Sequence, residues 1–457
     1  MKHQNQVRRF GHWVVGAVIM TLPGLASASG FQLSEHSAES TGRANSGGAA
    51  MSDDSTSVAW NPANLVLIDD NDLAFSSTLI RLGADFTKIS ATDAIGQPLS
   101  GTEGGSVGKL GMTPGMFYAQ RINERMVWGV GLTAPFGLAT DYEAGSIFRY
   151  QALYSKVAIL QLNPSLGISI SDNFSVGFGL DFQYMTVKLS SSVDFGLVCF
   201  SEVDPLTCSG LGYTPQNNDG YGELEGSSTG FGLNFGATYH YSHGRVGITY
   251  RSQIEHQLRG TGKFFNVPAL FLAQGVFVNS GIRADFDTPD LLQISWYHEI
   301  NDRWRISADF SRSGWSSFQE LRVRYDNPLQ PDTVETEGWE NVSRYAIGVD
   351  FDMNDSFTLR AGVALDVSPI PEPVPFAGAT SPSPSRTARL PGADRTWLAF
   401  GATWNMSPNT QLSTAWAHLF LDDDIRFDHS GALGDRIIGS FEADADILSL
   451  QVSHQFD

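Results

Sequence analysis

The sequence predicts an all-β fold, a transmembrane antiparallel β-barrel, on three observations. Of its 457 residues, 42% are hydrophobic and 11% aromatic but only 17% are charged, an unusual balance for a water-soluble protein of this length. Beyond the N-terminus no apolar run reaches the ~20 residues of a spanning helix. Short segments instead alternate apolar and polar residues. A closed barrel satisfies all three, because alternate residues of each strand face lipid while the others face a polar interior. The mean hydropathy of -0.13 agrees with such a mixture.

The first 28 residues predict a cleavable secretory signal peptide. Lys2, Arg8 and Arg9 precede an apolar run over residues 13–25, and Ala26-Ser27-Ala28 supplies small residues for cleavage. The apolar run is shorter than a spanning helix, so we expect removal of residues 1–28 during export.

The strand pattern is clearest from Phe174 to Tyr184. One face carries large apolar groups at every second position, and the other carries Ser175, Gly177, Gly179, Asp181 and Gln183. The same division recurs over residues 344–351 and 357–366. Because successive side chains of a strand point to opposite sides, we expect the apolar face to meet lipid and the small, polar face to line a narrow interior.

Connections of two lengths alternate along the chain. Short, turn-prone segments fall at residues 122–125, 171–173, 241–244, 299–303, 354–356 and 405–409. Long connections fall at residues 88–112, 139–155, 190–228, 261–281, 326–338, 368–394 and 421–439. Outer-membrane barrels have short periplasmic turns and long external loops, so this order predicts about 14 strands with both termini in the periplasm of a Gram-negative bacterium.

The final strand, Ile447–Phe456, ends in a near-terminal aromatic residue on an amphipathic segment. This end resembles the signal that the barrel-assembly machinery reads, although Asp457 follows the phenylalanine. We therefore expect that machinery as a partner.

The charge and the reactive residues exclude several kinds of function. A formal net charge of -20 argues against nucleic-acid binding, which needs clustered lysine and arginine. His240 and His243 flank a turn without a third ligand at metal-binding spacing, so no metal site is expected. No serine or cysteine is marked as a nucleophile beside a base, and no cofactor motif stands out. For Cys199 and Cys208 the loop position and the oxidising periplasm favour a disulfide over two free thiols or a metal pair.

Residues 29–71 lack the two-residue alternation of a barrel strand. Small residues dominate in Thr41-Gly42-Arg43-Ala44 and Ser46-Gly47-Gly48-Ala49-Ala50, followed by Asp53-Asp54. Such a segment would either pack inside the narrow lumen or form a disordered periplasmic arm.

Several of these segments match a known family in their order along the chain. They are Gly30-Phe31-Gln32-Leu33, Gly42-Arg43-Ala44, Asn61-Pro62-Ala63, Phe136-Gly137-Leu138-Ala139-Thr140, Trp315-Ser316-Ser317-Phe318-Gln319, Asp366-Val367-Ser368-Pro369-Ile370-Pro371 and Asp394-Arg395-Thr396-Trp397-Leu398. The ordered set resembles the FadL family of outer-membrane long-chain fatty acid and hydrocarbon transporters.

The resemblance implies a signal peptide over residues 1–28, a hatch (plug) inside the lumen over residues 29–71, and a barrel over residues 72–457. It also implies an inner pocket and a lateral opening through the wall. By this resemblance Phe31 would contact ligand, with an ordinary plug contact as the alternative. Asn61, Pro62 and Ala63 would lie beside a kink of the third strand at Gly137, with a simple strand-end glycine as the alternative.

The expected function is diffusive uptake of hydrophobic compounds, either long-chain fatty acids or hydrocarbons and aromatics. Fatty-acid members of the family have basic residues near the ligand carboxylate, but the two matching positions are Ser191 and Glu335. We therefore expect neutral ligands unless another cation substitutes, and Arg322 is the first candidate. The alternatives are a general porin and a barrel enzyme or adhesin. The expected partners are a hydrophobic small molecule and outer-membrane lipids, around a monomer without a cofactor.

Overall fold

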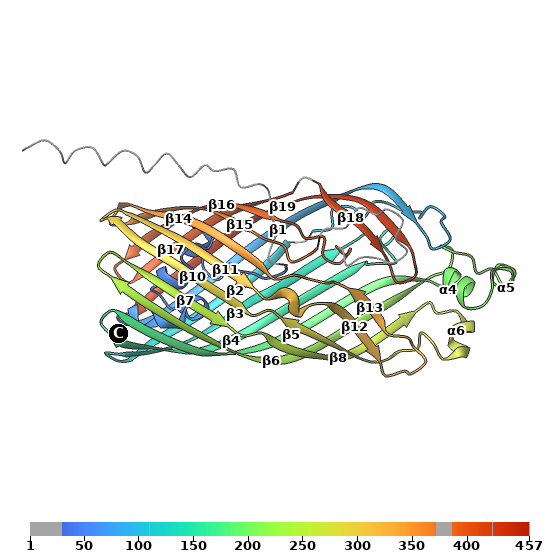
Figure 1. Cartoon of the computed structure of the whole chain (residues 1–457), viewed down its shortest axis with the longest axis horizontal. Helices are drawn as coiled ribbons and strands as arrows, with labels where there is room; N and C mark the ends of the chain where they lie inside the picture. Colours follow the sequence, from blue (N-terminus) through green and yellow to red (C-terminus); the bar gives the residue numbers. More distant parts are fainter. Residues whose placement is uncertain (1–29, 109, 372–385, 423, 457) are drawn as a thin grey trace, which may run out of the picture.

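The computed structural model describes residues 30–108, 110–371, 386–422 and 424–456 (Figure 1). The predicted signal peptide lies outside these residues. The described strands form one antiparallel sheet that closes on itself through pairing of the first strand with the last. Five pairs of consecutive segments continue each other across short breaks, so that 19 strand segments build a closed barrel of 14 strands.

The bounds of the strands before the middle of the barrel are β1 Asn71–Thr92, β2 Leu110–Asn123, β3 Met126–Asp141, β4 Tyr154–Ser171, β5 Phe174–Asp194, β6 Asp219–Tyr241, β7 Gly244–Arg251, β8 Ile254–Phe265, β9 Ser280–Thr288 and β10 Leu291–Asn301. The later strands are β11 Trp304–Ser313, β12 Glu320–Tyr325, β13 Thr333–Thr336, β14 Val342–Asn354, β15 Phe357–Asp366, β16 Arg395–Ser407, β17 Thr410–Leu421, β18 Ile425–Ser430 and β19 Arg436–Phe456. The continuing pairs are β7 with β8, β9 with β10, β11 with β12, β13 with β14, and β17 with β18.

The faces of the strands follow the predicted alternation through most of the barrel. On β5 the side chains of Phe178, Leu180 and Tyr184 are exposed on the outside, whereas Ser175 and Asp181 are buried inside. A small inward face leaves room in the lumen for another part of the chain. The prediction of an apolar outer face and a small, polar inner face is therefore confirmed for this strand.

The alternation is inverted in β8, β9 and β12. Their apolar residues, such as Leu258, Phe286 and Leu321, are buried inside, while charged residues such as Arg259 and Arg283 face outward. Charged groups on an outer face are costly in hydrocarbon but not in water. These segments therefore extend beyond the membrane, and they bring apolar side chains into the interior.

All six predicted turns join neighbouring strands, but six of the seven predicted loops contain strand residues, and residues 326–338 include the whole of β13. Residues 421–439 contain β18 and the start of β19, which pair with each other from Ile425–Phe441 to Ser430–Arg436. Within residues 190–228, β5 continues to Asp194 and β6 begins at Asp219. Glycines and charged residues interrupt the apolar alternation at these strand ends, so the sequence pattern predicted loops there. Outside the membrane a strand needs no apolar outer face.

The N-terminal segment lies inside the barrel, near the end that carries the C-terminus (Figure 1). It folds into short helices, α1 Ala38–Thr41, α2 Gly48–Met51, α3 Ser57–Trp60 and the 3-10 helix η1 Pro62–Leu67. Arg43 of this segment pairs with Asp350 of β14 at 2.8 Å, and Asn61 donates a hydrogen bond to Thr238 of β6 at 3.0 Å. The segment is the expected hatch rather than a periplasmic arm.

The opposite end carries the helices α4 Phe195–Glu202, α5 Pro205–Gly210 and α6 Ala269–Gln274 (Figure 1). Cys199 of α4 and Cys208 of α5 form a disulfide with their Cα atoms 5.9 Å apart. Phe195 packs against Phe271 of α6, so the three helices share a small apolar cluster. In the described part of the chain, no helix is both long enough and apolar enough to cross a membrane.

Candidate functional site

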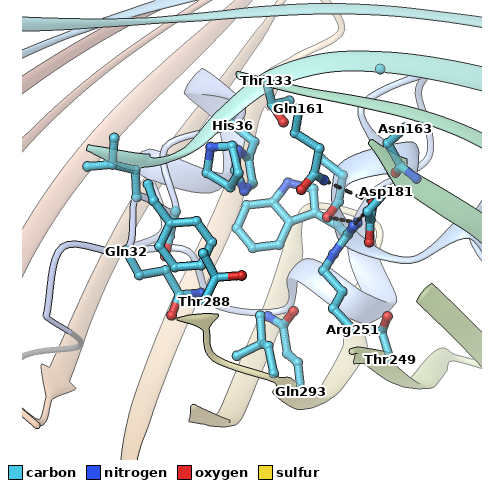
Figure 2. A pocket seen from close by; sticks show the side chains of 18 of the residues that line it. Gln32, His36, Thr133, Gln161, Asn163, Asp181, Thr249, Arg251, Thr288 and Gln293 are labelled. Carbon is cyan, nitrogen blue, oxygen red and sulfur yellow. Dashed lines mark hydrogen bonds and ion pairs between the residues drawn. The ribbon is translucent and has the colours of Figure 1, made fainter. Parts of the chain in front are cut away.

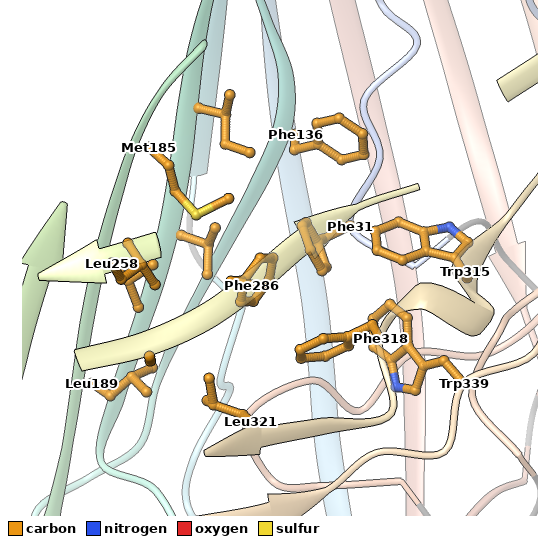
Figure 3. Packing of buried hydrophobic residues seen from close by; sticks show 14 of the residues in the cluster. Phe31, Phe136, Met185, Leu189, Leu258, Phe286, Trp315, Phe318, Leu321 and Trp339 are labelled. Carbon is orange, nitrogen blue, oxygen red and sulfur yellow. The ribbon is translucent and has the colours of Figure 1, made fainter. Parts of the chain in front are cut away.

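The inner surface of the barrel contains an aromatic cluster with Phe31 at its centre (Figure 3). The Phe31 ring lies 4.8 Å from that of Trp315, and between 5.6 and 5.9 Å from those of Phe136, Phe286 and Trp339. Trp315 belongs to the 3-10 helix η2, Trp315–Ser317, which interrupts the strand between β11 and β12. Four separate barrel segments therefore surround a single hatch side chain.

The hatch holds Phe31 in place by pairing with β3 as an additional strand. Leu33 donates its N–H to the Pro135 carbonyl at 2.8 Å, and Gly137 donates its N–H to the Phe31 carbonyl at 3.0 Å. Gly30 precedes this pairing with φ of +61°, a conformation that favours glycine. The residues Phe31 to Leu33 thus occupy an edge of β3 that a neighbouring barrel strand would otherwise cover.

The barrel wall has a seam between β2 and β3 at this position. The two strands pair from Asn123–Met126 to Met116–Leu132, and among the described residues they meet beyond that point only at an isolated bridge between Gly108 and Thr140. The pairing of β3 with β4 shifts register between Thr133 and Phe136, which places a bulge at Ala134-Pro135. Pro135 has no N–H for pairing with a neighbour, and a bulge bends its strand.

A cavity of about 710 Å³ runs from the hatch to this seam. On the hatch side Phe31, Leu33 and Glu35 line it. On the seam side it is lined by the β2 residues from Leu110 to Thr113 and the β3 residues from Phe136 to Asp141. Most of its remaining wall is apolar and includes Ile80, Leu82, Leu419, Ala445 and Ile447, while Lys156 and Arg395 also line it. A cavity of this size holds a drug-sized hydrophobic molecule.

Gly137 lies beside the seam, but the predicted kink is elsewhere. The interruption falls at Ala134-Pro135, and Gly137 does not adopt a positive φ. Its lack of a side chain serves a close approach instead, because a Cβ at this position would lie 2.9 Å from Leu33 Cδ1. The glycine leaves room for the hatch strand rather than bending β3.

The predicted position of Asn61, Pro62 and Ala63 beside Gly137 is wrong. These residues pack on the inner face of β4, β5 and β6, where a Cβ on Gly177 would lie 2.3 Å from the Pro62 carbonyl carbon. A Cβ on Gly236 would likewise collide with the Asn61 side chain. The small residues of this wall thus fit the Asn-Pro-Ala turn, and the hatch segment that lies beside Gly137 is Phe31 to Leu33.

The positions predicted to lie near a ligand carboxylate also need correction. Arg322 points away from the cavity and pairs with Glu320 at 2.7 Å and with Asp332 at 3.3 Å, because its neighbours Leu321 and Val323 take the inward positions of β12. Ser191 lies on β5 opposite Gly222 and does not line the cavity.

Glu335 is the predicted position that lies near the aromatic cluster. It forms an ion pair with Arg389 at 2.9 Å, with both side chains largely buried. Arg389 also donates a hydrogen bond to Ser155 at 3.2 Å. The neighbouring Glu337 accepts a hydrogen bond from Trp339 Nε1 at 3.0 Å, and burial, followed by the charge of Glu335, raises the pKa of Glu337 well above its ordinary value. This region therefore supplies no free positive charge for a carboxylate.

A separate polar chamber of about 70 Å³ lies between the hatch and the walls of β3 to β11 (Figure 2). Asp181 pairs with Arg251 at 2.9 Å and accepts a hydrogen bond from Gln161 at 3.0 Å. His36 faces this chamber, and burial, followed by the charge of Arg251, lowers the pKa of its imidazole to about 3, so that the ring is neutral. The chamber is large enough for a few ordered water molecules and too small for a drug-sized ligand.

The only group of three potential metal ligands among the described residues lies on the outside of the barrel. His418, Asp444 and Asp446 have ligand atoms within 4.8 Å of one another. His418 already contacts Asp446 at 3.0 Å, and Arg81 lies 3.8 Å from the same aspartate. Mutual pairing explains this group, which is remote from His240 and His243 in the chain.

A family model described as outer membrane protein transport protein (OMPP1/FadL/TodX) matches residues 19–456. The chain belongs to this family. It is therefore an outer-membrane transporter in a family that transports fatty acids and hydrocarbons, as its sequence predicted.

Similar proteins cover almost the whole transporter. A putative outer membrane protein of Neisseria meningitidis is 25% identical, over 94% of this chain and 95% of its own length. A protein of Escherichia coli O157:H7 named long-chain fatty acid transport protein is 28% identical, over 86% of this chain and 88% of its own.

Solved structures share the fold of the transporter. A FadL homologue of Pseudomonas aeruginosa superposes with a TM-score of 0.83 at 22% identity, over 94% of this chain and 100% of that chain. The toluene transporter TodX of Pseudomonas putida has a TM-score of 0.67 at 17% identity, over 94% and 100% of the two chains.

Sequence reasoning missed Glu35 and Arg389 as residues of the site. Glu35 stands among small polar residues of the hatch, and Arg389 stands within the predicted external loop 368–394. Neither has a periodic or spaced partner in the sequence. Only the folded chain brings Glu35 to the cavity and Arg389 to Glu335.

Proposed function

We propose that the transporter carries neutral hydrophobic molecules from the aromatic cluster around Phe31 to the seam between β2 and β3, where they enter the membrane sideways. The observation that carries this proposal is the cavity of about 710 Å³, because its lining includes Phe31 and also the β2 and β3 residues at the seam. Phe31 would contact the ligand directly.

The shape of the lumen favours this route over that of a general porin. The hatch occupies much of the interior on the periplasmic side, where Ala38, Ala44, Ala49 and Ala63 are completely buried, and it leaves a polar cavity of about 590 Å³ beside Arg360. A water-filled pore needs an open lumen. We also propose that the protein acts by transport without catalysis, in keeping with its family.

The charges around the cavity favour a neutral ligand. Glu335 has its charge balanced by Arg389, and Arg322 faces outward. Arg395 lines the cavity, but it donates to the Gly30 carbonyl at 2.8 Å and its charge already acts on the Glu35 carboxyl, and Lys156 lines the cavity from the exposed face of β4. Burial of a carboxylate without a partner is costly. The relatives named for long-chain fatty acid and for toluene show that the family includes both kinds of ligand.

The test is a comparison of a long-chain fatty acid with the alcohol of the same chain length. Binding to the purified full-length mature protein is measured by quenching of tryptophan fluorescence, since Trp315 and Trp339 contact Phe31. The pH is set so that the acid is ionised. We expect the alcohol to bind as well or better, whereas an acid that binds about tenfold tighter, a gap of ~1.4 kcal/mol, would refute the neutral-ligand proposal.

The partners beyond the ligand remain predictions. We propose a monomeric barrel surrounded by outer-membrane lipid and inserted by the barrel-assembly machinery. The supporting features are the apolar outer face and the pairing of β19 with β1 down to Phe456 and Asn71, which closes the barrel within one chain.

A further inference from the structure

Glu35 is the hatch carboxyl that lines the cavity leading to the seam. Its side chain is only 7% exposed, and its Oε2 atom has no hydrogen-bond partner. Thr78 of β1 contacts the backbone carbonyl of Glu35 and not its carboxyl group. A buried polar atom without a partner is unusual and costly, so this oxygen is available to a molecule in the cavity.

The neighbouring charges are already engaged elsewhere. Arg395 and Arg344 are the cations that act on Glu35, but Arg395 donates to the Gly30 carbonyl at 2.8 Å and Arg344 donates to the Ala44 carbonyl at 2.6 Å. The two arginines lower the pKa of Glu35, and the negative charge of Asp366 raises it. Burial raises the pKa of the Glu35 carboxyl to about 7, against the smaller effects of a hydrogen bond from its own backbone N–H and of the two arginines.

Apart from a few polar and charged groups, the wall of the cavity that Glu35 lines is apolar. Ile80, Leu82, Leu419, Ala445 and Ile447 form one apolar patch of that wall. A hydrocarbon chain or an aromatic ring can therefore lie along this patch with one polar atom directed at Glu35. The cavity therefore offers an unpartnered carboxyl oxygen at the hatch and an apolar surface beside it.

We propose that Glu35 anchors the hydroxyl group of a neutral hydrophobic ligand, so that the transporter prefers fatty alcohols or alkylphenols to plain hydrocarbons. This inference rests on the proposed function of the cavity. A hydroxyl group can donate to the ionised carboxylate and can accept from the protonated carboxyl. An amine cation would be repelled by Arg395 and Arg344, and a ligand carboxylate would be repelled by the ionised form of Glu35.

The experiment compares para-octylphenol with octylbenzene, which lacks only the hydroxyl group. Both dissociation constants are measured by tryptophan fluorescence on the full-length mature protein in detergent, for the wild type, Glu35→Gln and Glu35→Met. The ratio of the two constants is compared between variants, which cancels their different partition into micelles. We expect the phenol preference to fall about tenfold in Glu35→Met, a loss of ~1.4 kcal/mol, and to survive in Glu35→Gln because an amide still donates and accepts.

Glu39→Gln is the matched control. Glu39 is also a hatch glutamate, but it pairs with Arg360 at 2.9 Å and does not line the cavity. Its substitution should leave the phenol preference unchanged. An unchanged preference in Glu35→Met, or an equal loss in Glu35→Gln and Glu35→Met, overturns the inference while octylbenzene binding upholds the proposed function. Failure of the wild type to bind either compound overturns both.

A second measurement needs only the wild-type protein. The methyl ether para-octylanisole accepts a hydrogen bond but cannot donate one, so it requires the protonated carboxyl of Glu35. Between about pH 5 and about pH 9, on either side of the Glu35 pKa, we expect anisole binding to weaken about fivefold relative to phenol binding. Parallel pH profiles for the two compounds would overturn the inference even if Glu35→Met did not fold.

Discussion

At the scale of single residues, Glu335 is negatively charged, whereas a fatty-acid site would have a basic residue near the ligand carboxylate. Its carboxylate lies 2.9 Å from Arg389, which comes from a segment more than fifty positions away in the chain. Leu390, the next residue after Arg389, lines the cavity. The pair balances its own charge, so the arginine does not serve as a ligand cation while Glu335 is present.

Substitution of Glu335 by glutamine should therefore release Arg389 for a ligand carboxylate. A buried cation that has lost its partner is stabilised more by a new carboxylate than an exposed cation is. We expect the affinity for a long-chain fatty acid, relative to its alcohol, to increase up to about tenfold, ~1.4 kcal/mol. Tryptophan fluorescence titration of both ligands measures this ratio.

Arg322→Gln supplies the control for this prediction, because Arg322 faces outward and pairs with Glu320 and Asp332. That variant should bind acid and alcohol in the wild-type ratio. If Glu335→Gln also keeps the wild-type ratio, Arg389 does not reach the ligand.

At the level of secondary structure, β3 has one edge shared by two different partners. Up to Leu132 its partner is β2, and from Pro135 to Gly137 its partner is the hatch segment Phe31 to Leu33. The bulge at Ala134-Pro135 separates the two regions. The hatch therefore covers the strand edge at the seam from inside, and a change at this edge should alter transport before it alters the barrel.

Gly137→Val tests this arrangement. A valine Cβ would lie 2.9 Å from Leu33 Cδ1, and the larger valine side chain would displace the Leu33 side chain or the hatch strand that carries it. Overpacking of this kind costs roughly 1–3 kcal/mol. We expect uptake of a hydrophobic substrate by intact cells to fall severalfold, while the purified variant still shows the heat-dependent gel mobility of a folded barrel.

Gly145→Val is the corresponding control, since a Cβ at Gly145 would meet nothing within 4 Å. Its uptake should equal that of the wild type. Normal uptake by a correctly folded Gly137→Val protein would show that cargo does not pass this seam.

The molecule as a whole has two unlike ends. The hatch and the C-terminus lie toward the end with the short turns, and the helices α4, α5 and α6 extend from the other (Figure 1). In the outer membrane this arrangement places the helical loops outside the cell and the turns in the periplasm. The disulfide of Cys199 and Cys208 would then lie on the exterior.

Single cysteines at Asn217 and Asn354 test this orientation in a background without Cys199 and Cys208. Both positions are exposed, Asn217 in the long connection between β5 and β6 and Asn354 at the turn after β14. An impermeant thiol reagent should label only the first in intact cells and both after lysis. Equal labelling of the two in intact cells would contradict the orientation.

The sequence by itself determined the barrel, because strand faces and turns are local properties. The alternation from Phe174 to Tyr184 and the turn at residues 171–173 need only the period of a strand and the conformational preferences of a few neighbours. For the same reason the inverted faces of β8 and β12, where water replaces lipid, misled the prediction for Arg322.

The tertiary structure alone decided the site, because its contacts join residues that the chain keeps far apart. Asn61 meets Gly236 and Phe31 meets Trp339, and no local pattern relates the members of either pair. The register of the closed barrel fixes which inward side chain faces each hatch residue. Burial then sets the chemistry, since Glu35 is an ordinary glutamate in the sequence and a buried carboxyl with one unpartnered oxygen only inside the lumen.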